Sequence, residues 1–220
     1  MNNKPLSIDY FSDILCVWAW IAERRIEELK KEFKDKIEIR YQYIDLFGDT
    51  ETRIQTQWAN KGLHEGFNKH VVAAASPYES APVSSDVWRV TRPTTSANAH
   101  MILKAIELSH TKKLSMEFAY VLRRAFFIES KDISDLETIF NLLEQAGINT
   151  EKINFTLNNG TALASLTTDY QKAHEYGIKG SPSFVMNEGR QNLFGNIGYR
   201  VMQANIEELL RGSSTQASWC

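Results

Sequence analysis

Cysteine is scarce in this chain. Its 220 residues include two, Cys16 and the last residue, Cys220. Three residues after the first, where a redox pair would carry its second cysteine, stands Ala19. A dithiol site resolves its own mixed disulfide, because the second thiolate attacks it. The missing partner therefore argues against dithiol oxidase chemistry, and Cys16 needs an external thiol if it acts in redox exchange.

Long apolar runs and a large excess of one charge are also missing. No stretch approaches the roughly 20 apolar residues of a membrane span, and residues 1–7 lack the apolar region of a signal peptide. A net charge of −2 gives no reason to expect nucleic acid. We therefore expect a cytoplasmic protein with neither a membrane nor a nucleic-acid partner, in which Cys16 and Cys220 form no disulfide.

Metal-ligand spacing is absent as well. Structural and catalytic metal sites draw histidine, cysteine or carboxylate ligands from recurring spacings. Four of the histidines form no such spacing with cysteine or carboxylates, namely His64, His70, His110 and His174. We expect no metal site.

Alternating and helical patterns near the N-terminus indicate an α/β fold. The hydrophobic fraction of 43% suits one soluble domain, or one domain with a large insertion. Residues 6–12 and 37–44 alternate as strands and flank a helical pattern over 17–34, an order that implies parallel strands. The charge run from Glu23 to Lys36 is interpreted as the solvated face of this helix.

The middle of the chain is predicted to be helical, and the last quarter returns to strands. Residues 49–92 are interpreted as irregular and polar, with room for helix around 50–72. Because the helical patterns interrupt an α/β sandwich, an inserted helical block explains the chain length. The expected helices are 95–110, 114–128, 134–146, 150–158, 160–176 and 199–210, and the expected hairpin strands are 183–187 and 191–194. The expected caps are Thr94, Thr95 or Ser96 for the first helix, and a box of Ser134 with Glu137 for the third.

Cys16 lies between the first strand and the first helix. A thiol there faces unpaired backbone N–H groups and the positive end of the helix dipole, which favour thiolate and lower the pKa. The interpretation without a functional role is a buried, inert cysteine, since free cysteines often lie in the protein interior. The placement favours a reactive or ligand-facing thiol.

Four segments carry a resemblance to a known family. Residues 9–25, DYFSDILCVWAWIAERR, resemble the active-site segment of DsbA-like thioredoxin-fold proteins, with Val17 in place of proline and Ala19 in place of the second cysteine. The other segments are TSANAH at 95–100, AFFIESKDIS at 125–134 and YGIKGSPSFV at 176–185. The chain most resembles the cytoplasmic FrnE-like oxidoreductases, and is related to kappa-class glutathione transferases and 2-hydroxychromene-2-carboxylate isomerases.

The resemblance implies an architecture and a cleft. It predicts a thioredoxin-like domain from residues 1–60 and 159–212, a helical insertion over 61–158 and a flexible tail over 213–220. Pro182 is expected to be cis and to present the backbone of Ser181 opposite Cys16, where a peptide or glutathione pairs as an added strand. Trp18 is expected to flank this cleft as an apolar wall.

Other positions are ambiguous between site and core. Asn196 stands where the transferase branch has a serine that holds glutathione, but Ile197 replaces the next aspartate, which weakens a dedicated glutathione site. His100 is more often a partly buried packing residue than a catalytic one, and Trp88 either lines the cleft or packs. Ala19 in turn is also consistent with a degenerate site kept for binding.

Three functions remain open. The first is a thiol-disulfide oxidoreductase that works through Cys16 alone, with glutathione as external thiol and no tightly bound cofactor. The second is a glutathione-dependent transferase or isomerase. The third is a non-catalytic module whose cleft binds a peptide or a small molecule. The superfamily also makes a homodimer plausible.

Overall fold

A mixed four-stranded sheet forms the centre of the molecule. The computed structural model describes residues 4–211, so the predicted tail and Cys220 lie outside the described residues. The strands are ordered β2-β1-β3-β4. Strand β1 pairs in parallel with β2 and antiparallel with β3, which forms an antiparallel hairpin with β4. Their bounds are β1 Leu6–Ser12, β2 Ile37–Tyr43, β3 Ser183–Met186 and β4 Gln191–Phe194.

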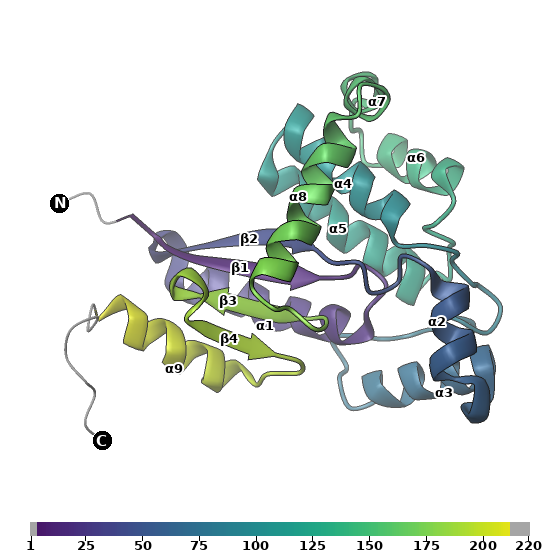
Figure 1. Ribbon diagram of the computed structural model, residues 1–220, viewed down its shortest axis with the longest axis horizontal. Coiled ribbons are helices and arrows are strands. Elements are labelled where there is room, and N and C mark those ends of the chain that lie inside the picture. The colour runs from purple at the N-terminus through teal and green to yellow at the C-terminus, as the bar shows by residue number, and fades with distance from the viewer. Residues whose placement is uncertain (1–3, 212–220) are drawn as a thin grey trace.

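Helices cover both faces of this sheet (Figure 1). Helix α1 (Val17–Phe33) and helix α9 (Tyr199–Leu210) pack with one face through side chains such as Tyr10 and Phe184. Helix α8 (Thr161–Glu175) packs on the opposite face, where Phe11 and Val185 are buried. This two-sided layering explains why successive β1 residues are buried, since both faces of a covered strand avoid water.

The remaining helices form two groups around the sheet (Figure 1). Helices α4 to α7 stand beside α8, and α2 and α3 lie apart from them. One continuous cluster of buried side chains joins residues 14–21 to these helices, so the helical region and the start of α1 share a core. The bounds are α2 Thr50–Gln57, α3 Leu63–Ala75, α4 Ala97–Ser109, α5 Lys112–Phe127, α6 Leu136–Gln145 and α7 Thr150–Asn158.

The helix that the sequence allowed around residues 50–72 is present as α2, whose Asp49 cap accepts from Thr52 N–H, and α3, so residues 49–92 are less irregular than predicted. Two other local predictions were wrong. The cap of α6 is Asp135, whose carboxylate accepts from the N–H groups of Glu137 and Thr138, and not Ser134. Glu23 is buried rather than solvated, because it pairs with the buried Arg123. No helix of residues 4–211 is long and apolar enough to cross a membrane.

Candidate active site

The segment Asp13–Cys16, here called the thiol loop, turns the chain from β1 into α1. Cys16 N–H donates to the carbonyl of Asp13 at 3.1 Å, and the Cys16 carbonyl accepts from the N–H groups of Ala19 and Trp20. Cys16 is therefore the N-cap residue of α1, as its position in the sequence predicted. Its side chain makes no capping hydrogen bond.

The Cys16 thiol is buried, and burial opposes its ionisation. Its side chain is 4% exposed, and Sγ donates to the carbonyl of Ser181 at 3.3 Å. Burial raises the pKa of Cys16 above its ordinary value and outweighs the polar contacts that lower it. The expectation of a lowered pKa was wrong because the first turn of α1 lies in the core, where desolvation of a thiolate exceeds the attraction of the helix N-terminus.

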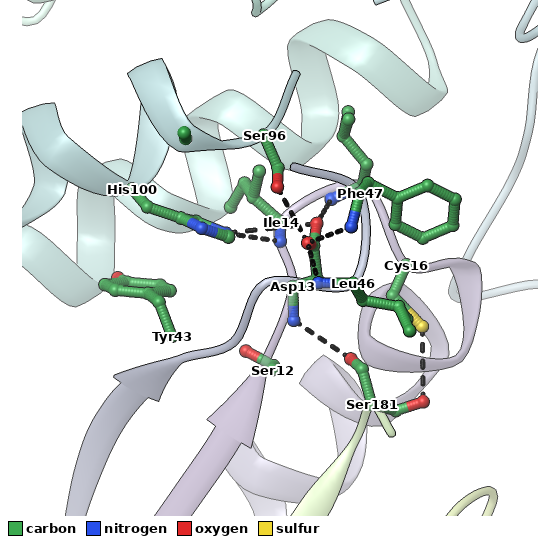
Figure 2. A network of polar contacts seen from close by, with 12 residues as sticks. Ser12, Asp13, Ile14, Cys16, Tyr43, Leu46, Phe47, Ser96, His100 and Ser181 are labelled. Carbon is green, nitrogen blue, oxygen red and sulfur yellow. Dashed lines mark hydrogen bonds and ion pairs between the residues drawn. The ribbon is translucent and has the colours of Figure 1, made fainter. Parts of the chain in front are cut away.

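The loop that precedes β3 lies against the thiol loop (Figure 2). The Ser181–Pro182 peptide bond is cis. Ser181 contacts the thiol loop twice, because its carbonyl accepts from the Cys16 thiol and its Oγ accepts from the N–H of Asp13 at 3.0 Å. Residues 165 positions apart in sequence thus meet at the reactive sulfur.

A cleft of about 260 Å³ opens beside these residues. Its aromatic walls come from Trp18, Trp58, Phe67 and Phe194, and the last of these is 58% exposed. Such a volume is small for a drug-sized ligand but suits one end of an extended peptide or tripeptide. The remaining lining residues are Cys16, Val17, Leu46, Phe47, Arg53, Gln57, His70, Lys179, Gly180 and Ser181.

The charges that line the cleft are of one sign. Arg53 from α2 and Lys179 are cationic, and the lining contains no Asp or Glu among the described residues. The guanidinium of Arg53 lies 4.9 Å from the ring centroid of Phe47, and its Nε is buried with no hydrogen-bond partner within residues 4–211. Burial lowers the pKa of Arg53, which still leaves this strongly basic group charged. The cleft therefore favours an anionic ligand.

Beneath the cleft lies a buried carboxylate that the sequence patterns did not single out. Asp13 accepts from Leu15 N–H at 2.9 Å, from Phe47 N–H at 2.9 Å and from Leu46 N–H at 3.2 Å. It also accepts from the hydroxyl of Ser96 at 2.7 Å (Figure 2). Burial raises the pKa of Asp13 to about 6, and these hydrogen bonds oppose the rise. Ser96 begins α4 but donates to Asp13 instead of making a side-chain cap.

His100 belongs to this network rather than to the cleft. It is fully buried, its Nε2 accepts from the N–H of Ile14 at 3.0 Å, and its ring stacks on Tyr43 at 4.6 Å between centroids. Burial lowers the pKa of His100 to about 3, so the ring is neutral near pH 7. Its Nδ1 has no hydrogen-bond partner among the described residues. The ring therefore fixes the thiol loop and does not face the cleft.

Two other candidates lie away from the cleft lining. Trp88 is fully buried among Phe47, Phe67 and Phe126, so it packs the core. Asn196 is on the surface, where its Oδ1 accepts from Arg25 and its Nδ2 donates to the hydroxyl of Tyr78. Both side-chain atoms of Asn196 already have protein partners, which leaves Asn196 poorly placed to hold a ligand.

A buried ion pair lies behind the first two turns of α1. Glu23 accepts from Arg123 of α5, which also donates to Ser12 Oγ at 3.0 Å. Tyr41 donates to the second oxygen of Glu23 at 3.4 Å. Burial raises the pKa of Glu23 despite Arg123. Burial also lowers the pKa of Arg123, but the attraction of Glu23 together with that of Tyr10, Tyr41 and Tyr43 exceeds this effect, and the pKa of Arg123 is raised. Glu23 is buried because Arg123 satisfies it.

Comparisons with known proteins agree with this fold. A family model described as a DSBA-like thioredoxin domain matches residues 7–207. The ClpXP adapter protein SpxH of Halalkalibacterium halodurans is 24% identical over 215 residues, covering 95% of this chain and 69% of that protein.

Two solved structures show the same fold. The probable DsbA oxidoreductase SCO1869 from Streptomyces coelicolor matches with a TM-score of 0.74 and 18% identity, over 98% of this chain and 94% of the other. The cytosolic disulfide reductase DsbM from Pseudomonas aeruginosa matches with a TM-score of 0.70 and 20% identity, over 94% and 99% of the two chains. DsbM has also been solved with GSH.

Proposed function

The chain belongs to the DSBA-like thioredoxin domain family, and on that basis we propose that it is a cytoplasmic thiol-disulfide oxidoreductase that uses Cys16 alone, with glutathione as the external thiol. The observation that carries the proposal is the cleft, which joins the Cys16 sulfur and the Ser181–Pro182 loop to cationic walls. The structural similarity to DsbM, which has been solved with GSH, supports the choice of thiol.

The reaction needs two exchanges. In the first, the Cys16 thiolate attacks the glutathione sulfur of a mixed disulfide, so that a Cys16–glutathione disulfide forms and the substrate leaves as a thiolate. In the second, the thiolate of another glutathione attacks the glutathione sulfur of that adduct, releasing oxidised glutathione and restoring Cys16. The two electrons that reduce the substrate come from two glutathione molecules. No second cysteine is needed, which is consistent with Ala19.

The cations of the cleft explain how this substrate would be selected. Glutathione carries two carboxylates and one ammonium group. A cleft lined by Arg53 and Lys179, and by no carboxylate of residues 4–211, therefore attracts it. The Arg53 guanidinium, which lines the cleft, donates to a carboxylate of the bound ligand. The aromatic side chains Trp18 and Phe194 cover the apolar part of the ligand.

The buried thiol favours a second candidate function. A thiol that donates to a carbonyl and has a raised pKa is a weak nucleophile at neutral pH. The relative from Halalkalibacterium halodurans is named an adapter for ClpXP, which is a role in protein binding. A non-catalytic module that binds a protein segment in the cleft is therefore the alternative.

The intact mass of the protein after exposure to oxidised glutathione across pH 5 to 9 tests the proposal. The Cys220→Ser background leaves Cys16 as the one thiol. A single glutathione adduct, lost in Cys16→Ser, supports the oxidoreductase. Arg53→Met and Lys179→Met should each slow its formation about five- to tenfold, as for a partly exposed ion pair of roughly 1 kcal/mol. The matched control is Lys31→Met, which removes an exposed cation from α1.

The other outcomes separate the alternatives. If Cys16→Ser loses adduct formation but keeps glutathione-dependent transferase or isomerase turnover, the isomerase alternative replaces the redox proposal. If no adduct forms at any pH and binding of a peptide is unchanged by Cys16→Ala, the protein is a binding module and the redox proposal is wrong.

A further inference from the structure

Asp13 is fully buried and does not line the cleft. It nevertheless contacts three segments that line or support the cleft. We propose that Asp13 is the positioning residue of this site, and that its carboxylate sets the width of the cleft by holding the thiol loop to the segment Ile44–Asp49, here called the wall segment. The inference rests on the proposed function, since it concerns the same sulfur and the same cleft.

The contacts of Asp13 bridge the two sides of the cleft. One carboxylate oxygen accepts from Leu15, which precedes Cys16 in the thiol loop. The other accepts from the N–H groups of Leu46 and Phe47, whose side chains line the cleft. One rigid group thus fixes the sulfur and the facing wall at the same time, and a shift of the carboxylate would move both.

The same residue reaches the other two supports of the site. Its backbone N–H donates to Ser181 Oγ, in the loop whose carbonyl accepts from Cys16. Its carboxylate accepts from Ser96 at the start of α4, and Ser96 N–H donates to the Phe47 carbonyl at 2.8 Å. The wall segment is therefore tied to α4 directly and through Asp13. Within residues 4–211 no other carboxylate accepts from the N–H groups of Leu46 and Phe47.

The charge state of Asp13 determines how many hydrogen bonds its carboxyl group accepts from the thiol loop and the wall segment. A carboxylate accepts at both oxygens, whereas a protonated carboxyl uses one oxygen as a donor and accepts fewer hydrogen bonds. The hydrogen bonds therefore favour the ionised form and weaken when Asp13 gains a proton, near pH 6. We expect the cleft to loosen as the pH falls through this value.

Few charged groups face Asp13. From α4, His100 Nε2 lies 3.9 Å from Oδ1, and this ring is neutral until far below pH 6. Arg53 of α2 and Tyr170 of α8 interact with Asp13 electrostatically, as does Cys16 of its own loop. Tyr170 and Cys16 are neutral and Arg53 is charged on both sides of pH 6, so Asp13 is the group among these that changes its charge there.

Two measurements on Asp13→Asn test the inference, with Ser96→Ala as a milder second variant. Asparagine keeps the shape but has one acceptor oxygen, so exchange protection of the Leu46 and Phe47 amides should fall about tenfold or more, as for a lost hydrogen bond to a charged group. The affinity for S-methylglutathione, which has no free thiol, should fall about tenfold. The Ser84 amide, which donates to the Phe127 carbonyl, is the internal control, and Asp35→Asn is the matched surface variant.

The pH profile separates positioning from a general structural role. In the parent protein, protection of these two amides and the affinity should both decrease below pH 6, and in Asp13→Asn this step should disappear. His70 lines the cleft and also titrates in acid, but it is present in both proteins, so the difference between the two profiles isolates Asp13.

Two results would overturn the inference, and a third would overturn the proposed function instead. Unchanged protection of Leu46 and Phe47 in Asp13→Asn overturns it, as does lost protection with unchanged affinity. If the parent protein binds no S-methylglutathione, the proposed function fails instead. The rate at which Cys16 reacts with a small neutral pyridyl disulfide then replaces the affinity: a rate altered by Asp13→Asn supports the inference, and an unaltered rate refutes it.

Discussion

Replacement of Arg123 by methionine should destabilise the protein strongly, although Arg123 lies outside the cleft. Its guanidinium is fully buried, pairs with Glu23 and donates to Ser12. Methionine fills similar space but leaves the Glu23 carboxylate inside the protein without its cation. The remaining partner of that carboxylate among the described side chains is the Tyr41 hydroxyl, at 3.4 Å.

The magnitude follows from the cost of an unpaired buried charge. Removing one partner of a buried ion pair costs about 3–5 kcal/mol, which is a large part of the roughly 5–15 kcal/mol that stabilises a typical domain. The melting temperature should fall by about 10 °C, since each kcal/mol is worth about 2–4 °C in a chain of this length. Arg124→Met, which removes an exposed cation paired with Glu129 at 3.5 Å, should cost less than about 1 kcal/mol.

The pH dependence gives the prediction a sign. Loss of Arg123 removes the group that lowers the pKa of Glu23, so this already raised pKa rises further in the folded state. The folded state then binds a proton that the unfolded state releases, and stability falls as pH increases through that window. The loss of stability in Arg123→Met should therefore be larger at pH 8 than at pH 5.

Urea unfolding of four proteins completes the test: the parent, Arg123→Met, Glu23→Gln and the double variant. The double variant should recover at least half of the loss seen in Arg123→Met, because glutamine carries no charge and keeps a partner for Tyr41. A loss below about 1 kcal/mol in Arg123→Met, or a double variant as unstable as the sum of the singles, would refute the account of a paired buried charge.

Three further predictions concern the thiol, a cap and the core. The thiolate of Cys16 should form at a pH above the ordinary thiol range, measured by the pH dependence of its alkylation in Cys220→Ser; half-reaction near pH 7 would contradict the burial argument. Asp135→Ala should cost about 1 kcal/mol in urea unfolding, as loss of an N-cap does, and an unchanged midpoint would rule out its capping role. Phe184→Ala should cost about 3–5 kcal/mol because the ring is buried in the cluster that α1 and α9 cover, whereas Phe194→Ala, at an exposed ring, should cost far less.

The fold could be predicted from the sequence because its strands and helices repeat clear periods. Alternation over 6–12 and 37–44 gave the parallel pair, and the turn at 188–190 gave the hairpin. Helices α2 and α3 were harder to predict, because polar residues dominate α2 and Gly62, in a left-handed conformation, precedes α3. Short polar helices carry little periodic signal of their own.

The site was predictable in its position but not in its electrostatics. The placement of Cys16 before a helix identified the N-cap, but the core that covers it comes from residues far away in sequence. Glu23 was interpreted as solvated because its partner, Arg123, is 100 residues away. Asp13 was overlooked for the same reason, as Leu46, Phe47 and Ser96 meet it through tertiary folding. A carboxylate next to apolar residues, here Ile14 and Leu15, a few positions before a candidate nucleophile is the signal that would have identified it.

The core that runs from the thiol loop into the helices limits how this protein can change over evolution. If the helical segment had a core of its own, it could be replaced by that of a relative without any effect on the chemistry of the thiol. Here residues 14–21 and helices such as α4 and α5 bury their side chains against one another. Replacing those helices with ones of different side-chain volume would therefore change the packing around the Cys16 sulfur. New binding preferences would arise more readily from substitutions at the aromatic residues that line the cleft, such as the exposed Phe194, than from replacement of the helices beneath it.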